Sequence, residues 1–268
     1  MEHSITAYDR VKAARDPARP SVDAYVSALF EDFVEICGDR LGKNDGSILC
    51  GIGFFHRLPV TVIGPRKGHT TEENIRCNFG MSGPEGYRKA IRAMKQAEKF
   101  GRPVICFVDT PGAYPGIEAE NKGQAAAIAE SLACLSGLTV PIVSVITGEG
   151  GSGGALALAA GDRVYMLENA IYSVLSPEGF AAILWKDAQR APEAAQAMKL
   201  TAEELLSVGI CDGIIGEGEA LFQNVDDTLR KALTELCPLK TKALLRLRTD
   251  RYRRFTGPAV RSQEAPNA

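Results

Sequence analysis

VSVITGEGGSGGALALAAGD, residues Val143–Asp162, joins a β-branched apolar run to an alanine-rich segment through a cluster of glycines. Five of the seven residues from Gly148 to Gly154 are glycine. Because glycine loses more conformational entropy on folding than any other residue, so dense a cluster needs a reason. The pattern predicts a strand, a tight turn and a helix, and such turns often present main-chain N–H groups to a bound anion. We therefore predict a site built from backbone rather than from side chains.

Composition is typical of a soluble globular protein. The chain has 268 residues, of which 45% are hydrophobic and 24% charged, and its net charge is −2. This balance gives no indication of nucleic-acid or membrane binding. Its seven scattered cysteines, never spaced CxxC, favour reduced thiols and no metal site on this chain. No apolar run approaches the roughly 20 residues that a membrane-spanning helix needs. We expect a cytoplasmic protein.

The chain around the glycine cluster repeats the order strand, turn, helix. This order favours an α/β fold with parallel strands and right-handed crossovers, in one domain over residues 1–268. We expect flexible segments at 1–20 and 257–268. The predicted strands are 47–54, 60–63, 104–108, 140–146, 164–167 and 172–174. The predicted helices are 22–36, 84–100, 118–136, 153–160, 177–185, 192–198, 202–207, 220–236 and 240–255.

A second turn, DTPGAYPG, follows the preceding predicted strand at residues 109–116. Neighbouring parallel strands end at one crevice, where ligands bind. The two prolines stiffen this turn, and Gly112 and Gly116 permit unusual dihedral angles. Two adjacent turns can form an oxyanion hole, in which one donor typically lowers a barrier by about 3 kcal/mol. The alternative is a tight loop in which Asp109 caps backbone amides.

A hydrolase site is another interpretation of the glycine turn. Residues 150–154 match GxSxG, the pattern around a nucleophilic serine. Such a serine, here Ser152, needs a base, and in that fold the histidine follows it. All three histidines, His3, His56 and His69, precede Ser152. A triad in another chain order with His69 stays open, although nothing in the sequence links the two.

Nucleotide binding and simple packing are further interpretations. A P-loop ends in Gly-Lys-Ser/Thr, but Gly154 is followed by Ala-Leu, which excludes it. The GxGxxG pattern fits 148–153, yet no acidic residue ends a following strand at the expected spacing. Glycines also allow helices and sheets to approach closely, which we favour for Gly137 and Gly161. The density of glycines over 150–154 favours function there.

Four motifs together resemble a known family. They are DTPGAYPG (109–116), GEGGSGGALA (148–157), YSVLSPEG with AAILWK (172–186), and RKG with NFGMSGPEGYRKA (66–90). The chain resembles the α subunits of bacterial acetyl-CoA carboxylase carboxyltransferase from about residue 7 to 255. The resemblance implies a crotonase-like (ClpP/crotonase) spiral of ββα units with flanking helices. The implied reaction moves a carboxyl group from carboxybiotin to acetyl-CoA, forming malonyl-CoA for fatty acid synthesis.

The resemblance also implies roles for particular residues. The N–H groups of Gly153 and Gly154 would face the biotin carbonyl as an oxyanion hole, and Gly112 and Ala113 would line the same hole. Further candidates for substrate contacts are Gly150, Gly151, Tyr114, Lys67 and Arg76. For Lys67 and Arg76 a solvated or partner-facing loop is an equal alternative, and for Tyr114 a core position.

Partners and cofactors follow from the same resemblance. Biotin would arrive on a biotin carboxyl carrier protein rather than on this chain, and the other substrate would be a CoA thioester. A β subunit bearing a zinc ribbon would complete the enzyme as α2β2, with biotin carboxylase in the larger complex. The basic stretch 240–255, seven basic residues against Asp250, would dock on an acidic subunit surface rather than on RNA or a membrane.

The runner-up is a stand-alone crotonase-type acyl-CoA hydratase or isomerase. That enzyme needs carboxylates over the thioester, for which Glu118, Glu120 and Glu149 are the candidates.

Overall fold

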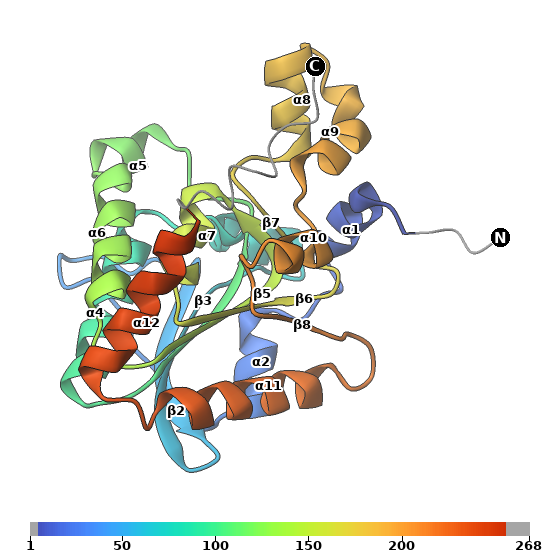
Figure 1. Cartoon of the computed structure of the whole chain (residues 1–268). Helices are drawn as coiled ribbons and strands as arrows, with labels where there is room; N and C mark the ends of the chain where they lie inside the picture. The colour runs from blue at the N-terminus through green and yellow to red at the C-terminus, as the bar shows by residue number, and fades with distance from the viewer. Residues whose placement is uncertain (1–4, 256–268) are drawn as a thin grey trace.

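A mixed β-sheet runs through the computed structural model, which describes residues 5–255 (Figure 1). Its strands are β1 (Glu31–Glu35), β2 (Ile48–Phe55), β3 (Leu58–Pro65), β4 (Val104–Thr110), β5 (Ile142–Gly151), β6 (Arg163–Leu167), β7 (Ile171–Ser173) and β8 (Gly213–Ile215). Their order is β1-β2-β3-β4-β5-β6-β8, and β7 pairs with the end of β5. The first three strands are antiparallel, and from β3 onward neighbours run parallel.

Helices cover both sides of the sheet. They are α1 (Ala7–Ala14), α2 (Val22–Leu29), α3 (Thr71–Arg76), α4 (Pro84–Lys99), α5 (Ile117–Asn121), α6 (Gln124–Gly137), α7 (Ser152–Ala159), α8 (Pro177–Trp185), α9 (Ala191–Met198), α10 (Ala202–Ser207), α11 (Leu221–Leu236) and α12 (Thr241–Arg254). On one side α6 packs between α4 and α7, with α12 beside it, and on the other α2 packs on α11. Helices α8 and α9 project away from the sheet (Figure 1). No helix in residues 5–255 combines the length and apolarity needed to span a bilayer.

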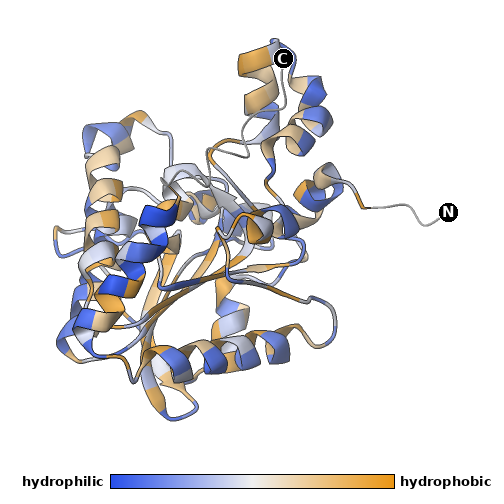
Figure 2. Ribbon diagram, viewed as in Figure 1, coloured by the Kyte–Doolittle hydropathy of each residue, from blue (hydrophilic) through white to orange (hydrophobic). Residues whose placement is uncertain are grey.

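The core is centred on β4 and β5. Every side chain of Val104–Val108 and Ile142–Ile146 is at most 1% exposed. Such apolar runs are typical of parallel strands covered on both faces, and full burial of one large apolar side chain contributes about 1.5–3 kcal/mol. Figure 2 shows the hydrophobic strands between helices whose outer faces are largely hydrophilic. The two strands that carry the predicted turns are therefore the most firmly held.

Two predicted helices differ from the structure. The helix expected over 22–36 ends at Leu29, and residues 31–35 form β1, which pairs antiparallel with β2. Phe30 takes an extended backbone and packs on Phe55 and Phe107. This residue is therefore buried where the chain leaves α2 and not as part of the apolar face of a longer helix. The helix expected over 118–136 is divided into α5 and α6 at Gly123, whose φ is +83°.

The N-terminal segment also differs from expectation. Residues 1–20 were expected to be flexible, but Ala7–Ala14 form α1, with a Thr6–Asp9 capping box. Val11 and Ala14 are buried, and α1 packs on α9. Flexibility is thus not what this helix shows, because its apolar residues bury against α9, which begins 184 positions later in the chain (191 minus 7). The tail expected to be flexible at 257–268 lies outside the described residues.

The basic helix α12 is tied to its own chain. Arg248 is 2% exposed and donates to both carboxylate oxygens of Asp162 at 2.8 Å. It also donates to the carbonyls of Leu135 and Leu138 at 2.7 Å, and these carbonyls lie at the end of α6. Arg251 pairs with Asp212. At least two of the seven basic residues therefore serve internal contacts, because a guanidinium can satisfy several orphan carbonyls at once. This corrects the view of the stretch as purely a subunit-docking surface.

Candidate active site

A bulge in β5 builds the site. β4 and β5 run in register from Val104↔Ile142 to Val108↔Ile146, but the next pair is Thr110↔Gly150. One residue of β4, Asp109, therefore faces three of β5. After the bulge β5 pairs with β7 instead of β6. Bulges of this kind commonly redirect a strand next to a functional site. The glycines that were expected in a turn thus begin inside the strand.

The two predicted turns pack backbone against backbone. A Cβ on Gly151 would lie 2.1 Å from the carbonyl oxygen of Pro111. A Cβ on Gly154 would lie 2.5 Å from the nitrogen of Ala113. The structure thus brings 111–113 and 151–154 together, as the convergence of parallel strand ends requires.

Close packing also explains two further glycines of the cluster. A Cβ on Gly150 would lie 2.7 Å from the Tyr172 ring, and one on Gly148 would lie 2.5 Å from Oδ1 of Asp109. Gly150 and Gly151, proposed from sequence as substrate contacts, are therefore required by packing within this chain. From sequence, close packing was favoured only for Gly137 and Gly161. In the structure, close packing requires a glycine at four of the five glycine positions from 148 to 154.

Gly153 is different. A Cβ there would meet only Ile128, at 3.6 Å, which is an ordinary van der Waals distance. Gly153 lines a wide, mostly apolar hollow of about 890 Å³. The hollow is walled by residues of α7, β7 and α10 and by the end of α12; they include Ser152, Leu156, Tyr172, Val174, Val208 and Tyr252. Nothing in the described chain requires a glycine at this position.

The N-terminus of α7 points unpaired donors at its surroundings. Ser152 has a φ of 51°, and this left-handed residue turns the strand abruptly into the helix. No side chain caps α7. Because the first N–H groups of a helix have no acceptor within it, those of Ser152, Gly153 and Gly154 remain for another partner. The helix dipole adds partial positive charge at this end.

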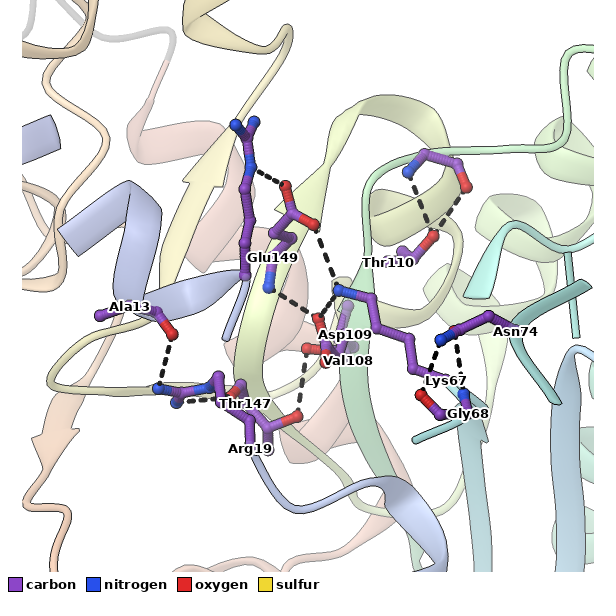
Figure 3. A network of polar contacts seen from close by, with 12 residues as sticks. Ala13, Arg19, Lys67, Gly68, Asn74, Val108, Asp109, Thr110, Thr147 and Glu149 are labelled. Carbon is purple, nitrogen blue, oxygen red and sulfur yellow. Dashed lines mark hydrogen bonds and ion pairs between the residues drawn. The ribbon is translucent and has the colours of Figure 1, made fainter. Parts of the chain in front are cut away.

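The second turn is held by Thr110. Its hydroxyl donates to the carbonyl of Gly112 at 2.7 Å and accepts from the N–H of Gly112 at 3.1 Å (Figure 3). Gly112 has a φ of +154°, which favours glycine. Its N–H is thus engaged within the turn, so Gly112 shapes the turn while Ala113, against Gly154, is the better placed donor.

A cluster of charges lies beneath the two turns (Figure 3). Lys67 Nζ lies 2.6 Å from Asp109 Oδ1 and 3.2 Å from Glu149 Oε2. Asp109 Oδ1 also accepts the N–H of Glu149 at 2.8 Å. Arg15 joins Glu149 to Glu178 of α8, with both contacts at 2.8 Å. Burial lowers the pKa of Lys67, but the two carboxylates outweigh it and the net pKa is raised. Lys67 is therefore an internal cation engaged with two carboxylates.

Arg76 and Tyr114 lie elsewhere. Both line a polar cavity of about 270 Å³ with Lys43, Glu85 and Lys122, and neither lines the hollow at Gly153. The Arg76 side chain is 73% exposed and reaches Glu72 at 3.7 Å. The structure thus separates these two candidates from the glycine turn.

The hydrolase interpretation finds no support in the described residues. His56 bonds Asp226 at 2.7 Å, and the ring of His69 lies 3.3 Å from the carbonyl of Pro17, so neither is paired with Ser152. None of the three carboxylates proposed for the hydratase interpretation lines the hollow: Glu149 is paired with Arg15 and Lys67, and Glu118 lines the cavity that Arg76 lines. The carboxylate that does line the hollow, Glu204, is paired with Lys199 at 3.3 Å. Residues 5–255 contain no group of three or more His, Cys, Asp or Glu side chains arranged to hold a metal ion.

Sequence reasoning missed Arg15, Arg19 and Glu178. One signal was present in the sequence. Glu149 lies within a stretch of apolar residues and glycines that is expected to be buried, and a buried carboxylate requires a partner. The sequence could demand a cation there, but it could not say which of the chain's 31 lysines and arginines supplies it.

Two backbone turns at strand ends, in a spiral α/β fold, define a crotonase-like protein. The fold matches transcarboxylase 12S, determined with methylmalonyl-coenzyme A and methylmalonic acid bound, with a TM-score of 0.72 and 18% identity over 88% of this chain and 46% of that chain. It also matches a Pseudomonas malonate decarboxylase hetero-tetramer in complex with coenzyme A, with a TM-score of 0.65 and 17% identity over 82% of this chain and 92% of that chain. These likenesses confirm the predicted fold class.

Sequence similarity then gives the family. The family model described as "Acetyl co-enzyme A carboxylase carboxyltransferase-like" matches residues 1–256. The chain is 52% identical to the acetyl-coenzyme A carboxylase carboxyl transferase subunit alpha of Anoxybacillus flavithermus, over 97% of this chain and 82% of that protein. It is 54% identical to the subunit of the same name from Clostridium perfringens, over 92% and 94%. The chain belongs to the acetyl-CoA carboxylase carboxyltransferase family, as its motifs predicted.

Proposed function

We propose that this chain is the α half of a biotin-dependent acetyl-CoA carboxyltransferase that forms malonyl-CoA for fatty acid synthesis. The observation that carries the proposal is the uncapped N-terminus of α7 at the edge of an apolar hollow. Family membership supplies the reaction class, and the geometry supplies a place for its developing charge.

The residues present fit biotin. Gly153 lines the hollow with backbone alone, and a compact, largely apolar ring system suits walls made by Leu156, Val174 and Val208. When bound, carboxybiotin supplies the carboxyl group and a ureido oxygen on which negative charge develops as that group leaves. Lys199 also lines the hollow, where it pairs with Glu204 at 3.3 Å, and the proposed role does not depend on it.

The chain's own part is to stabilise that charge. The N–H groups of Gly153 and Gly154 donate to the oxygen, helped by the dipole of α7. Ala113 is the donor we assign from the second turn, with Gly112 shaping it. One well-placed donor typically contributes about 3 kcal/mol to lowering the barrier. No base from this chain is required for this role, in keeping with the absence of a paired histidine at Ser152 in residues 5–255.

The remaining parts of the enzyme come from partners in this proposal. Biotin is carried by a separate carrier protein charged by biotin carboxylase, and the CoA thioester and any zinc belong mainly to a β subunit in an α2β2 assembly in the cytoplasm. Val174 at the hollow and Ile183 and Leu184 on α8 are 79%, 59% and 60% exposed, which favours a partner covering this face. A structural neighbour is titled a malonate decarboxylase MdcD-MdcE hetero-dimer, so the fold occurs in paired chains.

Co-production with the candidate β subunit tests the proposal. The complex is expected to carboxylate free biotin at the expense of malonyl-CoA, and each chain alone is expected to be inactive. An assembled complex without this activity would contradict the proposal. Hydration of an enoyl-CoA by this chain alone would favour the runner-up instead.

A further inference from the structure

We propose that Lys67 is a positioning residue for the oxyanion hole, acting through Asp109 and Glu149. The inference rests on the proposed function, because it concerns how the same two turns are held. It assigns to Lys67 a role different from the substrate contact and from the solvated or partner-facing position that the sequence offered.

The bulge creates the need for such a residue. Between Ile146 and Gly150, β5 makes no ladder pairs with β4. Side chains supply the missing partners: Arg19 donates to the carbonyl of Thr147 at 2.7 and 3.0 Å, and Asp109 accepts the N–H of Glu149 at 2.8 Å. On the side that faces β4, the path of the backbone through the bulge is therefore fixed by charged side chains, while Glu149 pairs with Ile171 of β7 on the other side.

Asp109 fits this place closely. Its carboxylate lies where a Cβ of Gly148 would be, with Oδ1 2.5 Å and Cγ 2.6 Å from that position. A shift of the carboxylate therefore moves the backbone of Gly148 and Glu149 with it. Glu149 is three residues before Ser152, where α7 begins, and Asp109 is three residues before Gly112. Both turns thus start from the same pair of carboxylates.

Lys67 holds that pair together. Asp109 and Glu149 are only 13% and 12% exposed on their side chains, and both contact the same Nζ. Without the ammonium group, two poorly hydrated carboxylates would repel each other, since only Arg15 would remain on Glu149. The repulsion would push apart the starts of the two turns and so misplace the N–H groups of Gly153 and Ala113.

The position of Lys67 separates this role from substrate binding. Lys67 lines a different cavity, of about 260 Å³, together with Arg15, Arg19 and Pro111. It is not among the residues of the hollow at Gly153. Loss of its charge is therefore expected to change the rate of the chemical step and to leave substrate affinity nearly intact.

The test compares Lys67→Met with Lys89→Met in the αβ complex. Lys89 is the control, because it is a lysine with a more deeply buried side chain than Lys67 and it donates to Asn44 and to the carbonyl of Asp45 rather than to a residue of either turn. We expect Lys67→Met to lower kcat for malonyl-CoA-dependent carboxylation of biotin at least about tenfold, since displacement of a catalytic group by about 1 Å can cost on the order of 100-fold. KM for both substrates should change less than about twofold. Lys89→Met should keep kcat.

Charge rescue provides the second readout. The double variant Lys67→Met/Glu149→Gln removes the repulsion and is expected to regain at least about a third of the lost kcat on a logarithmic scale. If Lys67→Met does not assemble, Lys67→Gln serves in its place and should lower kcat with KM unchanged.

Three results would overturn the inference while leaving the proposed function in place: an unchanged kcat in the active complex of Lys67→Met, a rise in KM alone, or a double variant no faster than the single one. An inactive wild-type complex would instead overturn the proposed function, and the inference with it.

Discussion

Replacing Gly154 by alanine tests whether the two turns depend on backbone contact. The new Cβ would lie 2.5 Å from Ala113 N and Gly112 C and 2.9 Å from Gly112 O. These are backbone atoms, so no side-chain rotation can relieve the contact. Overpacking of this kind costs about 1–3 kcal/mol, against which better helix propensity returns about 0.5–1 kcal/mol. We expect a net loss of roughly 1–2 kcal/mol, seen as a fall in Tm of roughly 2–8 °C.

Gly153→Ala is the matched control for this experiment. It adds the same methyl group one residue earlier in α7, where the nearest atom is 3.6 Å away. Its stability should equal or slightly exceed that of the wild type. Both variants are measured by thermal unfolding and by urea denaturation of the isolated chain. Equal stability of the two variants would refute the steric account of Gly154. It would mean that the fold does not need a glycine there and that its role lies in function alone.

Two further predictions concern buried charges. Burial raises the pKa of Glu217, but its bonds with Arg19 outweigh burial, and the net pKa is below the ordinary 4.5. The pair therefore stabilises the fold above that pH. This contribution is lost as the pH falls through the lowered pKa. Arg19→Met should therefore lower the unfolding free energy more near neutral pH than in acid, where only the loss of the bonds to the Thr147 carbonyl remains. A difference from wild type that stays constant across urea titrations at the two pH values would contradict this assignment. Arg248→Met should cost about 3–5 kcal/mol by leaving Asp162 buried and uncompensated, and a soluble variant within about 1 kcal/mol of wild type would show that this ion pair is dispensable.

Local pattern was sufficient for the elements that lie at the centre of the fold. The strands of the core have continuous apolar runs; outside the core, the predicted helices 177–185 and 202–207 coincide with α8 and α10. It failed for β1, because this strand at the sheet edge buries none of its side chains and so shows no alternation of buried and exposed residues. It missed β8, whose three residues are too few to show a period.

The site could be predicted only in part. The convergence of the two turns follows from parallel topology, which the sequence does indicate. The difference between Gly153 and its neighbouring glycines could not be predicted. The atoms that exclude a Cβ at Gly151 and Gly154 come from a turn some 40 residues earlier in the chain. The charge cluster was out of reach for the same reason, since Arg15, Lys67 and Glu149 meet only in the folded chain.

The central claim is that the N-terminus of α7 at Gly153 receives the negative charge of the reaction. The most direct measurement is the rate of malonyl-CoA-dependent biotin carboxylation by αβ complexes that carry glycine, alanine or valine at position 153. The account predicts full assembly and unchanged stability with alanine. It also predicts a rate that falls at least about tenfold with alanine and further with valine, because a side chain added beside Ile128 crowds the first N–H groups of α7 and displaces the oxygen that they bind. A valine variant that assembles and keeps the wild-type rate would contradict it.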